Sequence, residues 1–462
     1  MDKETLKNLL YKNESVADLA PETMAQADAF CEGYKKFLDN GKTEREACAY
    51  SEGLLKAAGY RPFVPGEALR PGDKIYWINR KKCVLAATIG KKSMAEGFHL
   101  NIAHIDAPRL DLRPVPLYES SDLAFLRTHY YGGIRKYQWP TIPLALHGVI
   151  YRADGSCVEI NIGEKDEDPV FCITDLLPHL GAKQGEKKLN DAIPGENLNV
   201  LVASRPVEDK ELENRVKLNV LKMLYEAYGI AEKDFINAEI EVVPAFKARD
   251  IGLDRAMIGS YGHDDRVDAY PALMAEIETK DPAYTTVCVL TDKEETGSDG
   301  VTGLNSMYTF HFLQQLCAAQ EVDYITAFQA SKCLSADVTA AYDPNFADAF
   351  EPSNSTYAGR GIAVYKYTGA RGKSSTNDAP AELVSYLTRL MDRNQIVWQI
   401  GELGKIDLGG GGTVAKYVAN QDIDTIDIGV PVLAMHAPYE IVSKVDVYMA
   451  YRTFKAFCED AE

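Results

Sequence analysis

Short apolar runs that end in histidine or in paired acids constrain the fold of this chain most strongly. Three such runs have the character of buried strands and lead into polar residues: 98–103 before His104, 286–291 before Glu294 and Glu295, and 430–435 before His436. Amphipathic helical segments lie between them, and this alternation predicts an α/β sheet with helices on both faces. In open α/β sheets, ligands gather beyond the carboxyl ends of the strands. The polar residues are therefore expected to converge on one pocket.

The residues at these strand ends are of types that bind metal ions. Five segments carry them: His104-Ile105-Asp106, His263-Asp264-Asp265-Arg266, Glu294-Glu295, Ser335-Ala336-Asp337 and Met435-His436. Two histidines plus acids suit zinc, and also manganese or cobalt. A second glutamate beside a ligand supplies the base that a metal hydrolase needs.

The first two segments each have a metal-binding interpretation and an ordinary one. Asp106 lies two residues beyond His104, so in an extended strand it would face the imidazole and hold its second nitrogen. The ordinary alternative is a solvated turn. One carboxylate of Asp264 and Asp265 could bridge two metals, although acids are also common where a helix begins. His263 could be a further ligand, but it is expected rather to shape this turn.

The remaining segments are similarly open when each is taken alone. Glu294 and Glu295 could form an exposed acidic loop, but adjacent buried acids repel each other unless cations compensate. Asp337 could cap a helix, and His436 could be a residue of the core or its rim. The four-glycine run 409–412 lacks the ending of a phosphate loop and indicates either close backbone approach beside the substrate or a plain tight loop. The order and joint placement of the segments favour a single site.

Bulk properties exclude several other classes of protein. The formal net charge of -18 argues against nucleic acid and anionic membrane as main partners. Nine cysteines without a CxxC pair make a disulfide framework unexpected. The N-terminal residues contain no apolar signal core and no run reaches transmembrane length, so we expect a cytoplasmic protein.

Changes in local amino-acid composition along the 462 residues predict two domains. Residues 17–57 have helical composition, with Phe30, Tyr34 and Phe37 at helical spacing. From Arg109 to about Phe246 the chain is rich in Pro, Gly, Tyr and short alternating segments. We therefore predict a discontinuous α/β domain formed by residues 1–108 and 247–462, which would carry the metal-binding segments, and an inserted, mostly β domain at 109–246.

Local patterns also predict individual elements. A helix is expected over 267–277, and another begins after Pro380 with Leu383 and Leu387 on its apolar face. The last helix is expected to begin with a capping box at Ser443 and Asp446.

As an ordered set, the site residues resemble the aspartyl aminopeptidase family of dinuclear zinc exopeptidases, and the resemblance spans nearly the whole chain. The stretches that carry it, besides Asp264-Asp265, are His104-Ile105-Asp106-Ala107-Pro108-Arg109-Leu110, Glu294-Glu295-Thr296-Gly297-Ser298, Ser335-Ala336-Asp337-Val338, Gly411-Gly412-Thr413, Asp427-Ile428-Gly429-Val430-Pro431-Val432 and Met435-His436.

This resemblance implies a role for each site residue. Asp264 would bridge two divalent metal ions, most simply zinc. The outer ligands would divide as His104 with Asp337, and Glu295 with His436. Glu294 would be the general base, and Asp106 would hold His104.

The resemblance also implies an architecture, an activity and partners. The family has a three-layer α/β catalytic domain with a mixed central sheet, interrupted by a dimerisation domain, and it forms dimers and dodecamers. Tyr131-Gly132-Gly133 resembles its dimer-loop region. The expected activity is an aminopeptidase that removes N-terminal residues, acidic ones among them, from peptides. Lys366 is the candidate contact for an acidic side chain.

The chain departs from the family pattern at three places. Asp264-Asp265-Arg266 stands where the family has Asp-Asn, Asp343-Pro344-Asn345 stands where it has His-Pro-Asn, and residues 367–377 match only loosely. Two other functions remain open from sequence. One is a deacylase or carboxypeptidase-like hydrolase with the same two metals, and the other is a non-catalytic assembly or cargo protein that keeps the fold.

Overall fold

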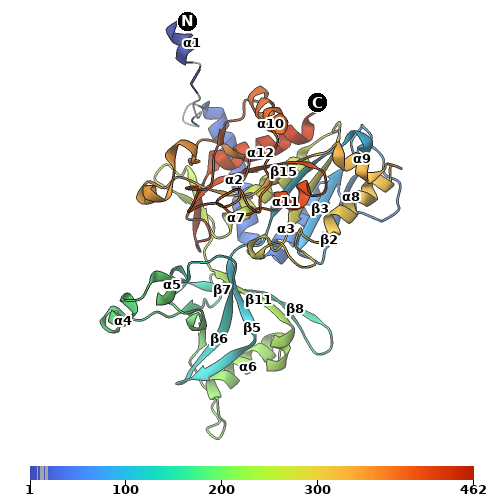
Figure 1. Cartoon of the computed structure of the whole chain (residues 1–462). Helices are drawn as coiled ribbons and strands as arrows, with labels where there is room; N and C mark the ends of the chain where they lie inside the picture. Colours follow the sequence, from blue (N-terminus) through green and yellow to red (C-terminus); the bar gives the residue numbers. More distant parts are fainter. Residues whose placement is uncertain (8, 11–14, 16–18) are drawn as a thin grey trace.

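A nine-stranded mixed sheet forms the centre of the larger of two lobes (Figure 1). The computed structural model describes residues 1–462 except residues 8, 11–14 and 16–18. The strands of this sheet follow the order β1 (Arg61–Pro62), β2 (Lys74–Asn79), β3 (Cys83–Thr88), β14 (Thr285–Thr291), β4 (Phe98–His104), β15 (Lys332–Ala336), β19 (Asp424–Gly429), β17 (Ile362–Tyr365) and β18 (Trp398–Ile400). The four strands from β14 to β19 are parallel, so their carboxyl ends meet at one edge.

Helices cover both faces of the central sheet, as the sequence predicts. One face packs against α2 (Pro21–Asn40), α3 (Glu44–Ala57), α7 (His263–Glu278), α10 (Ala381–Arg393) and α12 (Lys444–Glu459). The other face packs against α8 (Tyr308–Ala318), α9 (Tyr324–Gln329) and α11 (Ala415–Ala419). Alternation along β3 explains the two cores, because Val84 and Ala86 enter one while Leu85 and Ala87 enter the other.

The smaller lobe is built on a seven-stranded antiparallel sheet whose strands all come from residues 109–244 (Figure 1). Its order is β8 (Cys157–Ile162), β7 (Leu144–Tyr151), β11 (Ala238–Pro244), β5 (Arg109–Ser120), β6 (Leu123–Tyr131), β10 (Val200–Ala203) and β9 (Cys172–Ile173). Helix α6 (Arg215–Tyr228) packs on this sheet, and the short helices α4 (Ala182–Gly185) and α5 (Leu189–Ala192) lie in the connection between β9 and β10.

A third sheet of five short strands was not predicted. It contains β12 (Arg249–Ile251), β13 (Met257–Ser260), β21 (Glu440–Ser443), β20 (Pro431–Leu433) and β16 (Thr339–Ala340). Because β13 leads into α7 and β20 leads toward His436, this sheet joins two segments that carry site residues.

Two predictions about elements need correction. The run 430–435 does contain a strand, β20, but β20 belongs to the five-stranded sheet and not to the central sheet, where β19 ends at Gly429. The capping box is absent, because Ser443 makes no side-chain cap bond and Asp446 instead accepts hydrogen bonds from the backbone N–H groups of Gly359 and Gly361.

The N-terminal helical prediction holds from Pro21 onward, while its first two residues, Ala17 and Asp18, lie outside the described residues. A short helix, α1 (Lys3–Lys7), precedes them. Among the described residues, no helix combines the length and apolar character needed to cross a bilayer.

Candidate metal centre

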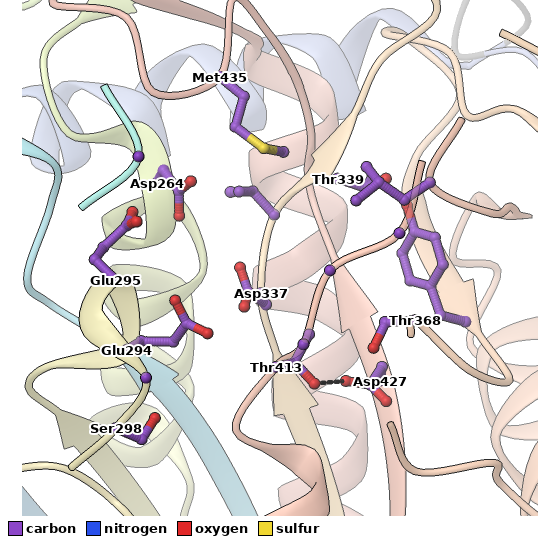
Figure 2. A pocket seen from close by; sticks show the side chains of 18 of the residues that line it. Asp264, Glu294, Glu295, Ser298, Asp337, Thr339, Thr368, Thr413, Asp427 and Met435 are labelled. Carbon is purple, nitrogen blue, oxygen red and sulfur yellow. Dashed lines mark hydrogen bonds between the residues drawn. The ribbon is translucent and has the colours of Figure 1, made fainter. Parts of the chain in front are cut away.

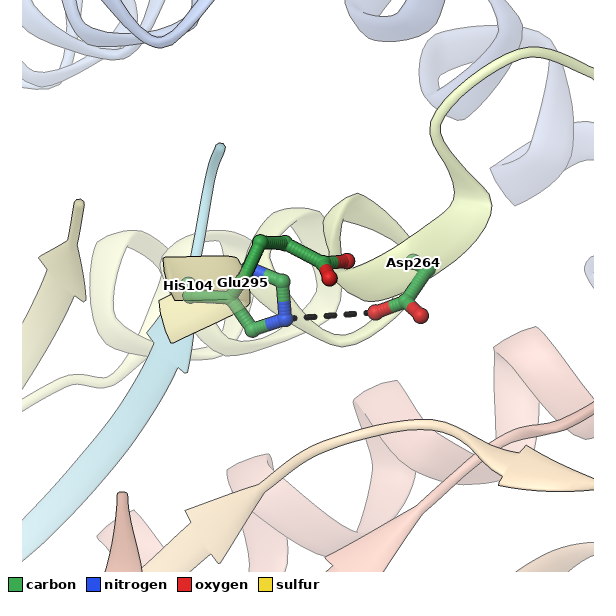
Figure 3. Close-up of side chains that lie close together, drawn as sticks. All are labelled: His104, Asp264 and Glu295. Atoms are coloured by element: carbon green, nitrogen blue, oxygen red, sulfur yellow. Dashed lines mark ion pairs between the residues drawn. The ribbon is translucent and has the colours of Figure 1, made fainter. Parts of the chain in front are cut away.

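Asp264 lies between the two predicted histidine ligands and offers one oxygen to each. His104 is the last residue of β4, and its Nε2 lies 3.2 Å from Asp264 Oδ1 (Figure 3). His436 approaches from the opposite side, with Nε2 3.1 Å from Asp264 Oδ2. Residues separated by more than 300 positions in sequence thus meet at one carboxylate.

Three further acids complete the cluster. Glu294 and Glu295 lie in a 3-10 turn after β14, and Asp337 follows β15 directly. Glu295 Oε2 is 3.5 Å from His436 Nε2, and Asp337 Oδ1 is 3.9 Å from His104 Nε2. Figure 2 shows Asp264, Glu294, Glu295 and Asp337 turned toward the same space.

Two groups of donor atoms have the compactness of a metal site. One consists of His104, Asp264 and Glu295, and the other of His104, Glu294 and Asp337; within each group the ligand atoms lie within 4.8 Å of one another. Imidazole nitrogen and carboxylate oxygen are the donors that zinc takes in catalytic sites.

Burial makes this cluster of acids costly without cations. Burial raises the pKa of Glu294 to about 7, and it raises the pKa of Glu295 and Asp337 well above their ordinary value. Burial alone would lower the pKa of His436, but hydrogen bonding to Asp264 and the charge of Glu295 raise it to about 11. The side chains therefore compete for protons, and bound cations would relieve this competition.

The hydrogen bonding of the buried polar atoms points to the same conclusion. Glu295 Oε1 is buried and has no hydrogen-bond partner in the described part of the chain, and His104 Nε2 and Asp264 Oδ1, which face each other at 3.2 Å, form no hydrogen bond either. A buried polar atom without a partner costs about 1–3 kcal/mol. Because these atoms surround one space, the residues present fit divalent metal ions.

Local structure around Asp264 explains how it reaches this position. Asp264 and Asp265 depart from helical geometry at the start of α7, and the peptide bond between them is cis. Regular helix begins after them, as the sequence predicts. His263 is no ligand: Tyr34 Oη lies 2.7 Å from its Nδ1 and the Ile258 carbonyl 3.1 Å from its Nε2.

Sequence reasoning missed three groups that position the ligands. Glu440 accepts hydrogen bonds from the backbone N–H groups of Asp264 and His436, at 3.1 and 2.7 Å. Asp265 accepts from the backbone N–H of His104 at 3.2 Å, and the Gly133 carbonyl lies 3.0 Å from His436 Nδ1. An acid at the start of the buried strand β21 was a weak signal for Glu440. Asp265 acts through its carboxylate and Gly133 through its backbone carbonyl, and no sequence pattern marks either contact.

A cavity of about 480 Å³ opens from the acidic cluster. The residues that line it beyond the cluster include Thr368, Leu403, Gly410, Gly411, Gly412, Thr413, Lys416, Tyr417 and Asp427. The glycine run therefore does lie beside this space (Figure 2 shows Thr413 paired with Asp427). Lys366 is not brought to the site: its side chain is exposed, and it does not line this cavity.

Comparisons with known proteins agree on one family. The model of a family described as aminopeptidase I zinc metalloprotease (M18) matches residues 37–458. A probable M18 family aminopeptidase 1 of Clostridium acetobutylicum is 47% identical over 444 residues, which cover 94% of this chain and 95% of that protein. A crystal structure of an M18 aminopeptidase from Thermotoga maritima has a TM-score of 0.93 at 40% identity, covering 97% of this chain and 100% of that one. The S. cerevisiae mApe1 dodecamer shares the fold, with a TM-score of 0.76 at 20% identity, covering 94% and 97%.

Proposed function

Because the chain belongs to the M18 family and is a zinc aminopeptidase, we propose that it removes the N-terminal residue of peptides at a site for two metal ions. The proposed ligands are His104, Asp264, Glu295, Asp337 and His436. The observation that carries this proposal is the placement of Asp264, whose two oxygens face the Nε2 atoms of two different histidines.

The proposed ligand sets follow from the distances around Asp264. Glu295 lies nearer to His436, and Asp337 faces His104, so each histidine gains one acid besides the shared carboxylate. Zinc suits this donor set, and manganese and cobalt accept the same donors. When bound, the two ions would polarise the scissile carbonyl and lower the pKa of a water molecule to roughly 7.

Glu294 is the proposed general base. Its nearest histidine nitrogen, His104 Nε2, is 4.0 Å away, and its side chain reaches the cavity. A carboxyl group whose pKa lies near neutrality can take a proton from the attacking water and return it to the leaving amine. Asp106 supports the site by facing His104 Nδ1 with its carboxylate at 3.2 Å.

For the proposed preference for acidic N-terminal residues, Lys416 replaces Lys366 as the candidate contact. Lys416 lines the cavity, and its ammonium group lies 4.8 Å from the centre of the Tyr417 ring, which also lines the cavity. An acidic first side chain would meet this ammonium group. The test compares Lys416→Met with the wild type: kcat/KM should fall about tenfold for aspartyl and glutamyl reporters, since losing one charge-assisted contact costs about 1.5 kcal/mol, and should stay unchanged for leucyl reporters.

The test of the proposed function combines elemental analysis with reporter profiling of the purified protein. We expect about two metal ions per chain, cleavage of free-amine aminoacyl amides, and loss of both after chelation. N-acetylated analogues serve as the control, because a deacylase would cleave them. Metal-loaded protein that cleaves only the acetylated series would refute the aminopeptidase proposal, and protein without bound metal would support a non-catalytic role.

We further propose that residues 109–246 form a dimerisation domain and that the protein is a homo-oligomer, with a dodecamer as one candidate. Four exposed leucines support a contact surface in the connection between β9 and β10: Leu176, Leu177, Leu180 and Leu189. Light scattering should show an oligomer in the wild type and smaller species in Leu177→Asp and Leu180→Asp. All nine cysteines lie within the described ranges and are unpaired, which suits the proposed cytoplasmic location.

A further inference from the structure

The smaller lobe sends one short segment into the metal centre of the larger lobe. This segment is Tyr131 at the end of β6 together with Gly132 and Gly133. A Cβ atom on Gly132 would lie 3.3 Å from Glu295, and one on Gly133 would lie 3.1 Å from His436 Nδ1. The backbone of the inserted segment therefore passes directly against two of the proposed ligands.

Tyr131 acts on His104 through Asp106. The Tyr131 hydroxyl donates to Asp106 Oδ2 at 2.7 Å. His104 Nδ1 lies 3.0 Å from the backbone carbonyl of Asp106 and 3.2 Å from its other carboxylate oxygen. Asp106 also accepts hydrogen bonds from the backbone N–H groups of Glu294 and Glu295, at 3.2 and 3.3 Å. Asp106 thus contacts three proposed site residues, His104 through both its carbonyl and its carboxylate, and Tyr131 holds that carboxylate.

The tyrosine ring is itself held firmly. It is 9% exposed, and the guanidinium of Arg109 lies 3.9 Å from its centre. Arg109 in turn pairs with Glu241 on β11 at 3.1 Å and with Glu44 on α3 at 3.3 Å. The smaller lobe therefore presents a fixed hydroxyl to Asp106.

Gly133 acts on the second histidine through its backbone. Its carbonyl lies 3.0 Å from His436 Nδ1, so Nδ1 carries the proton and donates it there. With Nδ1 held by this carbonyl, Nε2 is the ring nitrogen that faces Asp264 and Glu295 and is left for a metal ion. A hydrogen bond at the far ring nitrogen is the usual way in which a protein orients a metal-binding histidine.

We propose that Tyr131 and Gly133 are positioning residues through which the smaller lobe orients both metal-binding histidines, Tyr131 by way of Asp106 and Gly133 directly. This inference rests on the proposed two-metal function. Its consequence is that the metal centre is incomplete without the segment contributed by residues 131–133, although none of its atoms is proposed to bind a metal.

The test measures zinc affinity in the full-length protein by competition with a chromophoric chelator. Tyr131→Phe removes only the hydroxyl, and we expect one of two binding steps to weaken by about 10- to 100-fold. Excess zinc should restore turnover. Tyr130→Phe is the matched control, because Tyr130 is the preceding residue and is 46% exposed. Thermal unfolding of the metal-free proteins should be similar, which separates positioning from a folding defect.

A second variant tests the other histidine independently. Gly133→Ala places a methyl group against the His436 ring. Zinc binding on the His436 side should therefore weaken, while zinc binding on the His104 side should stay unchanged. Wild-type zinc affinities in either Tyr131→Phe or Gly133→Ala would overturn the inference for that residue. If the wild-type protein itself bound no zinc and cleaved no free-amine reporter, the proposed function would fail instead, so the two failures are distinguishable.

Discussion

Glu294 and the proposed ligand Asp337 lie at nearly the same distance from one histidine. Glu294 Oε2 is 4.0 Å from His104 Nε2 and Asp337 Oδ1 is 3.9 Å from it, whereas Asp264 approaches both rings within 3.2 Å. Distance alone therefore does not separate the proposed base from a ligand, but the consequences of removing each acid do. The division of labour between adjacent glutamates can therefore be tested by separating turnover from metal content.

We expect Glu294→Gln to lower kcat by about 100- to 10,000-fold, because the amide cannot take a proton from water. Metal content, measured by elemental analysis, should stay near that of the wild type. Glu321→Gln on the exposed surface is the control and should retain full activity. Normal turnover by Glu294→Gln would show that another group is the base.

Substitution of Asp264 should, in contrast, lower the metal content as well as the turnover. Asp264→Ala removes the carboxylate that faces both histidines, so both ions should be lost together and activity with them. Metal titration of the metal-free variant checks this, with circular dichroism confirming that it is folded. Retention of two tightly bound ions would contradict the bridging role.

The identity of the candidate ligands could be predicted because histidines and acids after apolar runs are visible one segment at a time. The positioning contacts of Glu440 and Gly133 could not be predicted, because the Glu440 carboxylate binds backbone N–H groups of the ligands and Gly133 uses its own carbonyl, and neither contact has a sequence signature. The position of the Lys366 side chain could not be predicted either, because the direction of a side chain is not visible in the sequence. Its neighbours Tyr365 and Thr368 line the cavity, but Lys366 itself turns outward.

At the scale of elements, the apolar periodicity predicted which residues are buried, but not which strands pair with one another. The apolar positions Leu383, Leu387 and Leu390 of α10 do enter the core. The run 430–435 is equally apolar and does form a strand, β20, yet the chain leaves the central sheet at Gly429, so β20 pairs in the five-stranded sheet. Burial is a property of single residues, whereas sheet membership depends on partners from distant segments.

Helix α12 supplies a prediction at this scale. Asp446 is fully buried, and its carboxylate accepts from Gly359 N at 2.6 Å and Gly361 N at 2.7 Å, just before β17. Asp446→Ala leaves two buried N–H groups without partners and should cost about 2–5 kcal/mol. Asp446→Asn keeps one acceptor and should cost less. Denaturant unfolding measures both, and an alanine variant as stable as the wild type would show that these bonds contribute nothing.

At the scale of the whole molecule, a buried ionic network joins the two lobes. His147 on β7 lies 2.8 Å from Glu46 on α3 and 3.1 Å from Glu164, which follows β8. Lys42, just before α3, pairs with Glu164 at 2.5 Å and donates to the Pro244 carbonyl at 2.8 Å. Its own carbonyl accepts from Arg266, two residues beyond Asp264, at 2.9 Å. The junction between the lobes is thus continuous with the start of α7.

This network predicts a pH dependence of stability. Burial alone would lower the pKa of His147, but Glu164 and Glu46 raise it above its ordinary value of 6.5. The protonated ring therefore stabilises the folded protein fully below pH 6.5, and this contribution is lost as the pH rises through the folded pKa. Burial alone would raise the pKa of Glu164, but the hydrogen bond from His147 and the nearby lysines lower it to about 2. The Glu164 carboxylate therefore stays charged over the whole pH range in which His147 titrates.

We compare the wild type with His147→Gln, whose glutamine cannot titrate. As the pH is raised above 6.5, the denaturation midpoint of the wild type should decrease relative to that of the variant. The variant should be less stable than the wild type at the lower pH by about 2–4 kcal/mol, because charge-assisted hydrogen bonds are lost. His129→Gln is the matched control, since His129 also lies in the smaller lobe but is exposed, and it should follow the wild type. If the curves of wild type and His147→Gln ran parallel, the charge on this ring would not contribute to holding the lobes together. The polar contacts of Lys42 and Arg266 would then have to maintain the junction without it.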